Sequence, residues 1–191
     1  MFEDLITSKT RIKVLYTFFE SPEEMFHVRE VVRRVEEEIN AVRRELIHLE
    51  KNGVLRKEPR ANRVYYYPDK NYPFYFDLIR IYSKSRGLGA DIIKNKVKLG
   101  KIKYAMMSGR FARGIRQNPE EVDLLVVGTV VLPELSLLVK KEEARIKHEI
   151  NYTVMTEEEF NFRKKRQDPF ISSIINASRI MLIGDEETLI V

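Results

Sequence analysis

Apolar residues recur at helical spacing three times within the first part of the chain. The first run predicts a helix over 8–19, with Ser8 as a side chain that can cap its start. A second, short helix is predicted over 28–35, and a third over 39–49, which ends near Gly53. The chain therefore opens with three short helices, each with one apolar face.

After Gly53 the apolar pattern changes to that of strands. Residues 54–57 and 63–67 flank a predicted turn over 58–62. The second of these runs, Arg-Val-Tyr-Tyr-Tyr, is rich in the β-branched and aromatic residues that favour strands, and Pro68 ends it. The pattern predicts a β-hairpin directly after the third helix.

Aromatic and glycine-containing segments fill the middle of the chain. A helix is predicted over 72–82, either as a connecting helix that packs into the core or as the contact face of a dimer. Its inward side is expected to hold Phe76, Ile79 and Tyr82. Residues 83–89 contain two glycines and are predicted to form a hinge. A helix over 91–99 is then expected to turn Ile92, Ile93 and Val97 inward.

The second half of the chain is organised around the stretch from Tyr104 to Gly128, which has the pattern of strand, glycine turn, short helix, loop and strand. Further apolar runs follow it. The predicted elements are strands over 104–106, 122–127, 150–154 and 178–183, and helices over 111–115 and 157–166. This alternation predicts an α/β unit built on a small mixed sheet.

Candidate chemistry gathers at the turn inside this stretch. Ser108 and Gly109 lead into a helix start, where bare backbone N–H groups can hold a phosphate. Glu121 and Asp123 are two residues apart, so within a strand both carboxylates leave the same face and can hold a divalent cation. Together these residues are the parts of a nucleotide-handling site.

Composition narrows the class of protein. The 191 residues suffice for one large or two small domains, and 43% hydrophobic residues are enough for packed cores. No apolar run approaches about 18 residues, no cysteine is present and the N-terminus lacks a signal-peptide pattern. We therefore expect a cytoplasmic protein without membrane spans, disulfides or thiolate metal sites. A charged fraction of 33% with only two glutamines is typical of thermophile proteins.

Positive charge is local rather than spread along the chain. The net charge is only +5, but residues 43–63 carry seven basic and three acidic side chains. A surface that binds nucleic acid is therefore expected in this region. The acidic run Glu36-Glu37-Glu38, which would repel phosphates, is expected to cap the third helix instead.

The run AVRRELIHLEKNGVLRKEPRANRVYYYP joins a basic helix to a basic hairpin. It resembles the recognition helix and wing of winged helix-turn-helix regulators of the ArsR and MarR type, and the resemblance covers about residues 8–70. It implies that the third helix enters the DNA major groove and that the wing straddles a phosphate strand. The implied DNA-binding residues are Asn40, Arg43, Arg44, His48, Arg56, Lys57, Arg60 and Arg63. The alternative is a solvated helix and hairpin in a domain that binds no DNA.

Three short pieces of the central stretch follow one another in the order Gly109-Arg110, Ala112-Arg113-Gly114 and Glu121-Val122-Asp123. They resemble the Gly-Ser, Ala-Arg-Gly and Asp-x-Asp motifs of the minimal nucleotidyltransferases of the polymerase-β superfamily. The resemblance implies a nucleotide bound at Ser108, Gly109, Arg110 and Arg113, and Mg²⁺ bound at Glu121 and Asp123. An ion pair of Arg113 with Glu121 or Asp123 that holds the turn is the alternative to ligand binding.

The chain departs from this family pattern at three positions. Arg110 replaces the serine of the Gly-Ser turn, and Glu121 replaces the first aspartate. The third carboxylate of the family corresponds to Asn151, whose amide can ligate a metal but cannot act as an anionic base. These three departures indicate a domain that has lost most of its catalytic set.

We therefore expect an α+β protein with a winged helix-turn-helix domain over 1–70, a connecting helix and hinge over 71–89, and a small mixed-sheet nucleotidyltransferase-like α/β domain over 90–191. The favoured function is a homodimeric, DNA-binding transcriptional regulator whose second domain senses a nucleotide or mediates assembly. One alternative is an active metal-dependent nucleotidyltransferase that modifies a protein partner such as a toxin. The other is a protein-interaction module with neither activity.

Overall fold

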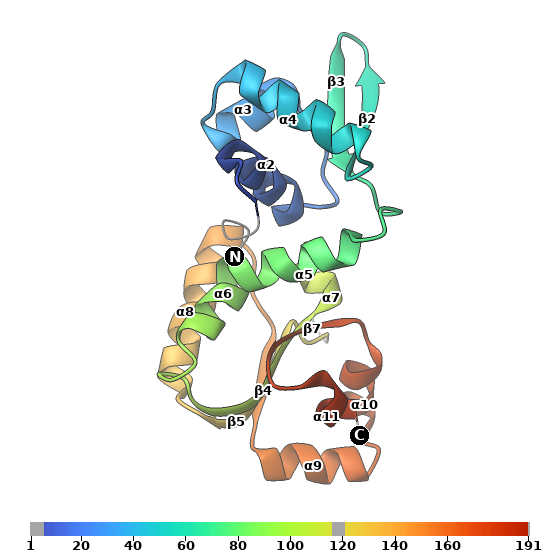
Figure 1. Ribbon diagram of the computed structural model, residues 1–191. Coiled ribbons are helices and arrows are strands. Elements are labelled where there is room, and N and C mark those ends of the chain that lie inside the picture. Colours follow the sequence, from blue (N-terminus) through green and yellow to red (C-terminus); the bar gives the residue numbers. More distant parts are fainter. Residues whose placement is uncertain (1–5, 116–120, 191) are drawn as a thin grey trace. The chain divides into compact units, whose positions relative to one another are not determined.

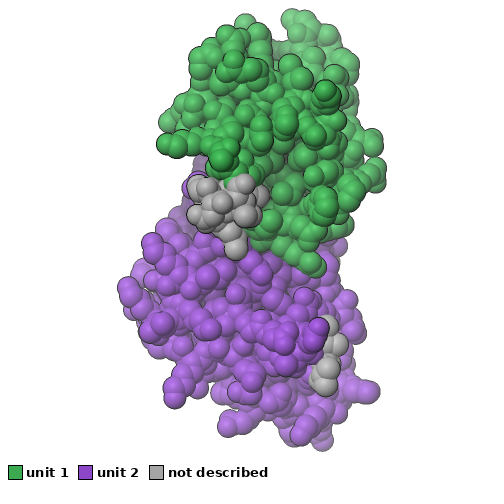
Figure 2. Space-filling model, viewed as in Figure 1, with its two compact units in different colours: residues 1–82 green, residues 83–191 purple. Residues whose placement is uncertain are grey.

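The chain divides into two compact units, residues 1–82 and residues 83–191 (Figure 1, Figure 2). The structure, a computed structural model, describes residues 6–115 and 121–190. Each unit combines helices with one small sheet, which confirms the predicted α+β class. The boundary between the units falls inside helix α5 (Tyr75–Ser85), within the segment 71–89 that was predicted to connect two domains. Within the described ranges, no helix combines the length and apolar character that crossing a membrane requires.

The first unit contains the three helices that the apolar spacing predicts. They are α2 (Lys9–Glu20), α3 (Val28–Val35) and α4 (Ile39–Lys51). Ser8 caps α2, and its hydroxyl accepts a hydrogen bond from the N–H of Arg11 at 3.2 Å. Glu38 caps α4, because its carboxylate accepts from the N–H groups of Asn40 at 2.7 Å and Ala41 at 3.1 Å. One member of the acidic run therefore has the capping role expected from the sequence.

The apolar faces of these helices pack against one another and against the sheet to form the first core. Its most deeply buried side chains include Val14, Phe18, Phe19, Val31, Val42, Leu46 and Leu55. Burial of one such aliphatic or aromatic side chain contributes about 1.5–3 kcal/mol relative to its exposure. This packing fixes the rotation of α4 and thereby decides which of its side chains face solvent.

An antiparallel sheet with the order β1-β3-β2 completes the first unit. Its strands are β1 (Phe26–His27), β2 (Leu55–Arg60) and β3 (Arg63–Pro68). The hairpin turn is shorter than predicted, since only Ala61 and Asn62 link the paired residues Arg60 and Arg63. Pro59, expected in the turn, lies in edge strand β2. Hydrogen-bonded and non-hydrogen-bonded pairs alternate along an antiparallel ladder, so proline fits at the second pair from the turn without loss of a ladder bond.

The predicted hinge over 83–89 is largely helical. Helix α5 continues to Ser85, and α6 (Gly87–Lys94) starts after one intervening residue. Gly87 has φ +59°, and a Cβ atom at this position would lie 2.8 Å from Oε1 of Glu142. Glycine is needed here for a close approach to α8 (Leu132–Ile146) and for the reversal of the chain, and not for hinge motion.

Three apolar residues that were expected to point inward are exposed. Phe76 on α5 is 58% exposed, whereas Ile79 on the same helix is buried. Ile93 and Val97 are also exposed, at 38% and 92%. The cause is that α6 ends at Lys94 and the following residues form turns, so the helical spacing used for Val97 does not apply.

A four-stranded mixed sheet with the order β6-β5-β4-β7 forms the centre of the second unit. Its strands are β4 (Gly100–Ser108), β5 (Leu124–Val130), β6 (Tyr152–Met155) and β7 (Arg179–Ile183), of which β5 and β6 are parallel. Helices α6 and α8 pack on one face (Figure 1). The other face carries α9 (Glu157–Lys165), α10 (Pro169–Asn176) and α11 (Glu186–Ile190). Because the parts of β4 and β5 over 104–107 and 124–127 are covered on both faces, they are apolar without alternation, whereas the first half of β4 alternates and exposes Lys101 and Lys103.

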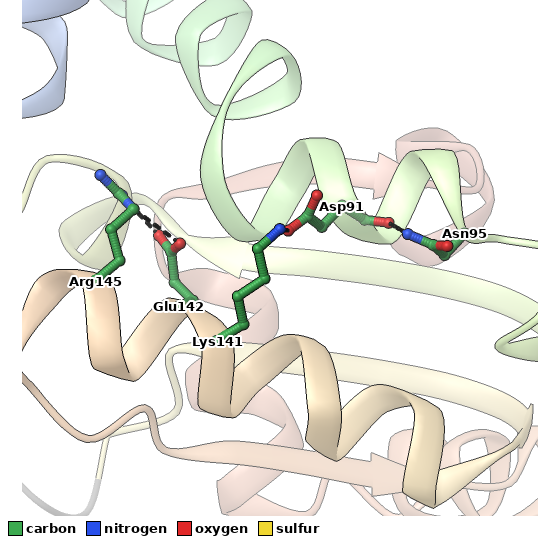
Figure 3. Close-up of polar contacts among 5 residues, drawn as sticks. All are labelled: Asp91, Asn95, Lys141, Glu142 and Arg145. Carbon is green, nitrogen blue, oxygen red and sulfur yellow. Dashed lines mark hydrogen bonds and ion pairs between the residues drawn. The ribbon is translucent and has the colours of Figure 1, made fainter.

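A polar network joins α6 to α8 on the first of these faces (Figure 3). Lys141 on α8 donates to Oδ2 of Asp91 on α6 at 2.7 Å. The next residue of α8, the buried Glu142, accepts two hydrogen bonds from Arg145 of the same helix, at 3.0 Å from Nε and 2.8 Å from Nη2. Paired charge-assisted hydrogen bonds of this kind satisfy a buried carboxylate, so the network is structural.

Candidate functional site

Helix α4 presents a polar face to solvent opposite its buried face. Since Val42, Leu46 and Leu49 point into the core, the other side of the helix remains exposed. The exposed side chains are Asn40, Arg43, Arg44, Ile47 and His48. All four residues that were predicted to contact DNA from this helix therefore lie on one accessible surface. Arg43 and Arg44 make no ion pair with any other residue that the structure describes.

The hairpin carries the four basic residues expected there, but three of them are already paired. Arg56 contacts Asp69 at 2.7 Å, Lys57 contacts Glu50 at 3.2 Å, and Arg60 contacts Glu58 at 2.7 Å. Arg63 is exposed and has no ion-pair partner in the described part of the chain. The charge of the hairpin is thus largely balanced in the absence of a ligand.

The Arg56–Asp69 pair shows how such an exposed contact changes the pKa of its carboxylate. Desolvation alone would raise the pKa of Asp69, but the hydrogen bonds from Arg56 and from the N–H of Asn71 outweigh it and lower that pKa. Exposed pairs of this type contribute little to stability because solvent screens them. A phosphate group can therefore compete for Arg56 at small cost.

In the second unit, the glycine turn forms at the end of β4 as predicted, but its N–H groups are occupied. The N–H of Gly109 donates to the carbonyl of Ser178 at 2.7 Å, and the N–H of Arg110 donates to the hydroxyl of Ser108 at 3.2 Å. Helix α7 (Gly109–Ala112) is also shorter than the predicted helix over 111–115. Two of the N–H groups expected to hold a phosphate, those of Gly109 and Arg110, therefore already have acceptors within the protein.

Gly109 is required at the turn because of its close approach to the segment before β7. A Cβ atom at Gly109 would lie 2.5 Å from Oγ of Ser178. Arg113 holds the same turn from the other side, since its Nε donates to the carbonyl of Gly109 at 3.0 Å. The expectation that Arg113 pairs with an acid is wrong. Arg110 instead lies near Glu121, with Nε 3.7 Å from Oε2.

Glu121 and Asp123 do not leave one face of a strand as predicted. Both precede β5, which begins at Leu124, and only the Asp123 side chain is buried, at 7% exposure. Oδ2 of Asp123 accepts the N–H of Asn151 at 2.9 Å, and the side-chain amide of Asn151 donates to the carbonyl of Glu121 at 2.9 Å. Asn151 also precedes its strand, β6, and its amide ties the acidic segment in place.

The surroundings of Asp123 favour its protonated form. Burial raises the pKa of this carboxyl, and the negative charge of Glu121 adds to the increase. The N–H of Asn151 and the positive charge of His148 act in the opposite direction but do not cancel the effect of burial.

The described residues contain no group of three or more histidine, aspartate or glutamate side chains placed to hold a metal ion. Within the described residues, Glu121 and Asp123 are the carboxylates that directly precede β5. Mg²⁺ prefers several oxygen ligands in near-octahedral geometry. These two described carboxylates, one of which accepts a backbone N–H, supply few of the ligands that two-metal chemistry needs.

A pocket of about 390 Å³ nevertheless lies beside the turn. Three arginines line it, together with one acid and a set of apolar side chains. The charged members are Arg110, Arg113, Arg179 and Glu121, and the apolar members include Met106, Leu125, Phe170 and Ile174. Three of the four residues predicted to bind a nucleotide, Ser108, Arg110 and Arg113, thus face one cavity.

The sequence did not predict that α10 and the start of β7 form one wall of this pocket. Arg179 lies at the start of β7, and its side chain is only 11% exposed. The dipeptide Asp168-Pro169 is the signal that could have located α10, because Asp168 caps the helix and proline occupies its first turn. Arg179 lies beside the turn at 108–109 because β7 pairs with β4. No local pattern in the sequence indicates this pairing.

Comparisons of this chain with protein-family models, with curated proteins and with solved structures find no match.

Proposed function

We propose that this protein is a DNA-binding regulator in which residues 1–82 form a winged helix-turn-helix unit. The order of three helices and a β-hairpin is the order of that domain class. In this proposal α4 is the recognition helix and the β2–β3 hairpin is the wing. The solvent-exposed face of α4 carries the proposal.

That face has the chemistry needed to read base edges. Arg43 and Arg44 can each donate two hydrogen bonds to guanine, and Asn40 can pair with adenine in the same manner. Ile47 is 57% exposed between them, which is unfavourable in water but suits contact with a thymine methyl group. An exposed apolar side chain among unpaired cations favours a DNA surface over a merely solvated helix.

The wing serves to position the protein on the phosphate backbone. Arg63 is available at once, and Arg56, Lys57 and Arg60 exchange their carboxylate partners for phosphates on binding. Because exposed ion pairs are weak, this exchange lowers the affinity only modestly. The wing is expected to add salt-dependent affinity with little sequence preference.

The second unit, in this proposal, has a nucleotidyltransferase-like arrangement that senses a ligand and does not transfer nucleotides. Support comes from the occupied N–H groups of Gly109 and Arg110 and from the engagement of the Asp123 carboxyl by Asn151. Two copies of the chain associate through the exposed aromatic residues Phe74 and Phe76, which matches the use of paired half-sites by winged helices.

The decisive experiment is DNA binding by the intact protein. We expect the wild type to bind random duplex DNA with an affinity that falls steeply with salt. The double variant Arg43→Ala/Arg44→Ala is expected to bind at least about tenfold more weakly, since such contacts contribute about 1–3 kcal/mol each. Fluorescence anisotropy at two salt concentrations measures both effects.

A charge-matched control is Lys94→Ala/Lys96→Ala, which removes two exposed lysines of the second unit. Its affinity is expected to stay close to that of the wild type. Equal losses in the two double variants would mean that only net charge matters, and the assignment of α4 would fail. Absence of wild-type binding at low salt would favour a protein-interaction module.

The rival function, active nucleotidyl transfer, is tested by incubation with labelled ATP and either Mg²⁺ or Mn²⁺. We expect no label on the protein itself or on proteins of a cell extract, because Asn151 provides no anionic base and Asp123 is withdrawn into the core. Incorporation that Asp123→Asn abolishes would establish the enzyme and contradict this part of the proposal.

A further inference from the structure

The pocket beside α7 has two chemically distinct sides. Arg110, Arg113 and Arg179 line one side together with the carboxylate of Glu121, and Arg179 is already paired with Glu186 through Nη1 and bonded to the carbonyl of Ile175 through Nη2. Phe170 and Ile174 of α10 contribute to an apolar wall. The volume of about 390 Å³ lies in the range of about 300–1,000 Å³ that is typical of small-molecule sites. The pocket therefore suits a ligand with an anionic head and an apolar body.

The arginines have donors that the protein itself leaves open. Arg113 uses Nε for the carbonyl of Gly109, and its terminal nitrogens have no partner among the described residues. The 3.7 Å contact of Arg110 with Glu121 is longer than a hydrogen bond, and Oε2 of Glu121 is buried without a hydrogen-bond partner in the described chain. The same holds for Nε of Arg179. These buried polar atoms mark a site that is incomplete without a further molecule.

A metal-bound triphosphate does not fit this site well. The N–H groups that would grip a phosphate chain are bonded to Ser178 and Ser108, and Asp123 is engaged by Asn151. What remains for an anion is the set of guanidinium groups, which bind phosphate oxygens through paired hydrogen bonds. One phosphate group matches this set better than three phosphates with a cation.

We propose that the pocket binds an organic monophosphate without a divalent cation, with its phosphate at Arg110 and Arg113 and its apolar or aromatic body against Phe170 and Ile174. A phosphate monoester carries about −1.5 to −2 charges at neutral pH, opposite in sign to the guanidinium groups of Arg110 and Arg113 that would bind it. Nucleoside monophosphates and simple aryl phosphates share this chemistry. The inference rests on the sensing role proposed for the second unit and is independent of DNA reading by the first.

Isothermal titration calorimetry of the intact protein in EDTA tests the inference. Phenyl phosphate is expected to bind at one site per chain. It is expected to bind more tightly than inorganic phosphate, which lacks the aromatic body, and than benzoate, whose carboxylate carries one negative charge and two oxygens in place of the phosphate group. AMP in place of phenyl phosphate shows whether a nucleoside is the preferred body. Arg110→Gln is expected to weaken binding by about tenfold or more. Lys101→Gln, an equally exposed cation of β4 outside the pocket, is expected to have no effect.

A steric variant separates the pocket from net charge. Ser173 lines the pocket from α10, so Ser173→Trp is expected to abolish binding, whereas Asn176→Trp on the same helix is expected to retain it. The inference is overturned if neither phenyl phosphate nor AMP binds in EDTA, if Mg²⁺ is required, or if Lys101→Gln weakens binding as much as Arg110→Gln. DNA binding measured on the same preparations shows whether the first unit works regardless of this result.

Discussion

Asp123 is the residue whose surroundings have the clearest consequence for the pH dependence of stability. Because its pKa is raised in the folded protein, the folded state keeps the proton at pH values where the unfolded chain has released it. The stability that Asp123 contributes is therefore fully present below its ordinary pKa of 3.8 and declines as the pH rises through the folded value. Above that value the contribution is constant.

Asp123→Asn removes this titration and keeps an oxygen that can accept the N–H of Asn151. We expect the variant to gain stability relative to the wild type as the pH rises from 3.8, and to keep that gain at neutral pH. Urea unfolding across this pH range measures the difference. Asp185→Asn, at an exposed carboxylate, is the control. A difference between wild type and Asp123→Asn that does not change with pH would refute the interpretation.

Residue types near the turn were predictable, but their contacts were not. The sequence placed Ser108, Gly109 and Arg113 at a glycine turn, and the structure has the turn there. The acceptors that occupy its N–H groups include Ser178, which is about seventy residues away and reaches the turn only through the pairing of β7 with β4. Long-range pairing of this kind leaves no local signal in the sequence.

At the scale of elements, the cap of α4 is the feature that links stability to the proposed DNA surface. Glu38→Ala removes both side-chain hydrogen bonds to the first turn of the helix. We expect a loss of about 0.5–2 kcal/mol in the free energy of unfolding, the usual cost of losing a capping side chain. Chemical denaturation of the intact protein, followed by helical circular dichroism, measures it.

Glu24→Ala is the matched control for the cap, because Glu24 is an exposed acid outside the helices of the first unit. Its stability is expected to stay within about 0.5 kcal/mol of the wild type. If both variants lose the same stability, loss of negative charge and not loss of the cap is responsible.

Long periodic elements were predicted well, and short ones were not. Helices α3 and α4 each bury one regular stripe, and α2 buries almost all of its residues from Ile12 to Phe19. The apolar spacing located all three to within a few residues. Strand β1 has only two residues and no alternation to detect, and it exists because β3 offers it a partner. The prediction for Val97 failed because the expected helix ran to residue 99, whereas α6 ends at Lys94. Helical spacing therefore does not show which residues after Lys94 point inward.

At the scale of the whole molecule, exposed aromatic residues support the proposed self-association. Phe74 and Phe76 are 60% and 58% exposed, and aromatic side chains of this kind are enriched in protein interfaces. We expect the intact protein to sediment as a dimer at micromolar concentration. The double variant Phe74→Ser/Phe76→Ser is expected to weaken dimerisation by at least about tenfold, because two aromatic contacts are lost.

Phe162→Ser serves as the control, since Phe162 is a similarly exposed aromatic residue of the second unit. This variant is expected to remain dimeric. A wild type that is monomeric at all accessible concentrations would contradict the dimer, and dissociation caused by Phe162→Ser alone would relocate the interface.

Pro59 in edge strand β2 has a consequence for the behaviour of the protein in concentrated solution. An open strand edge is a template onto which another chain can add a strand, which is a common route to aggregation. Proline offers no N–H to such an incoming strand, and it is flanked along β2 by charged residues that would need to be desolvated. The hairpin can therefore project a long, accessible edge toward a ligand while resisting growth into larger assemblies.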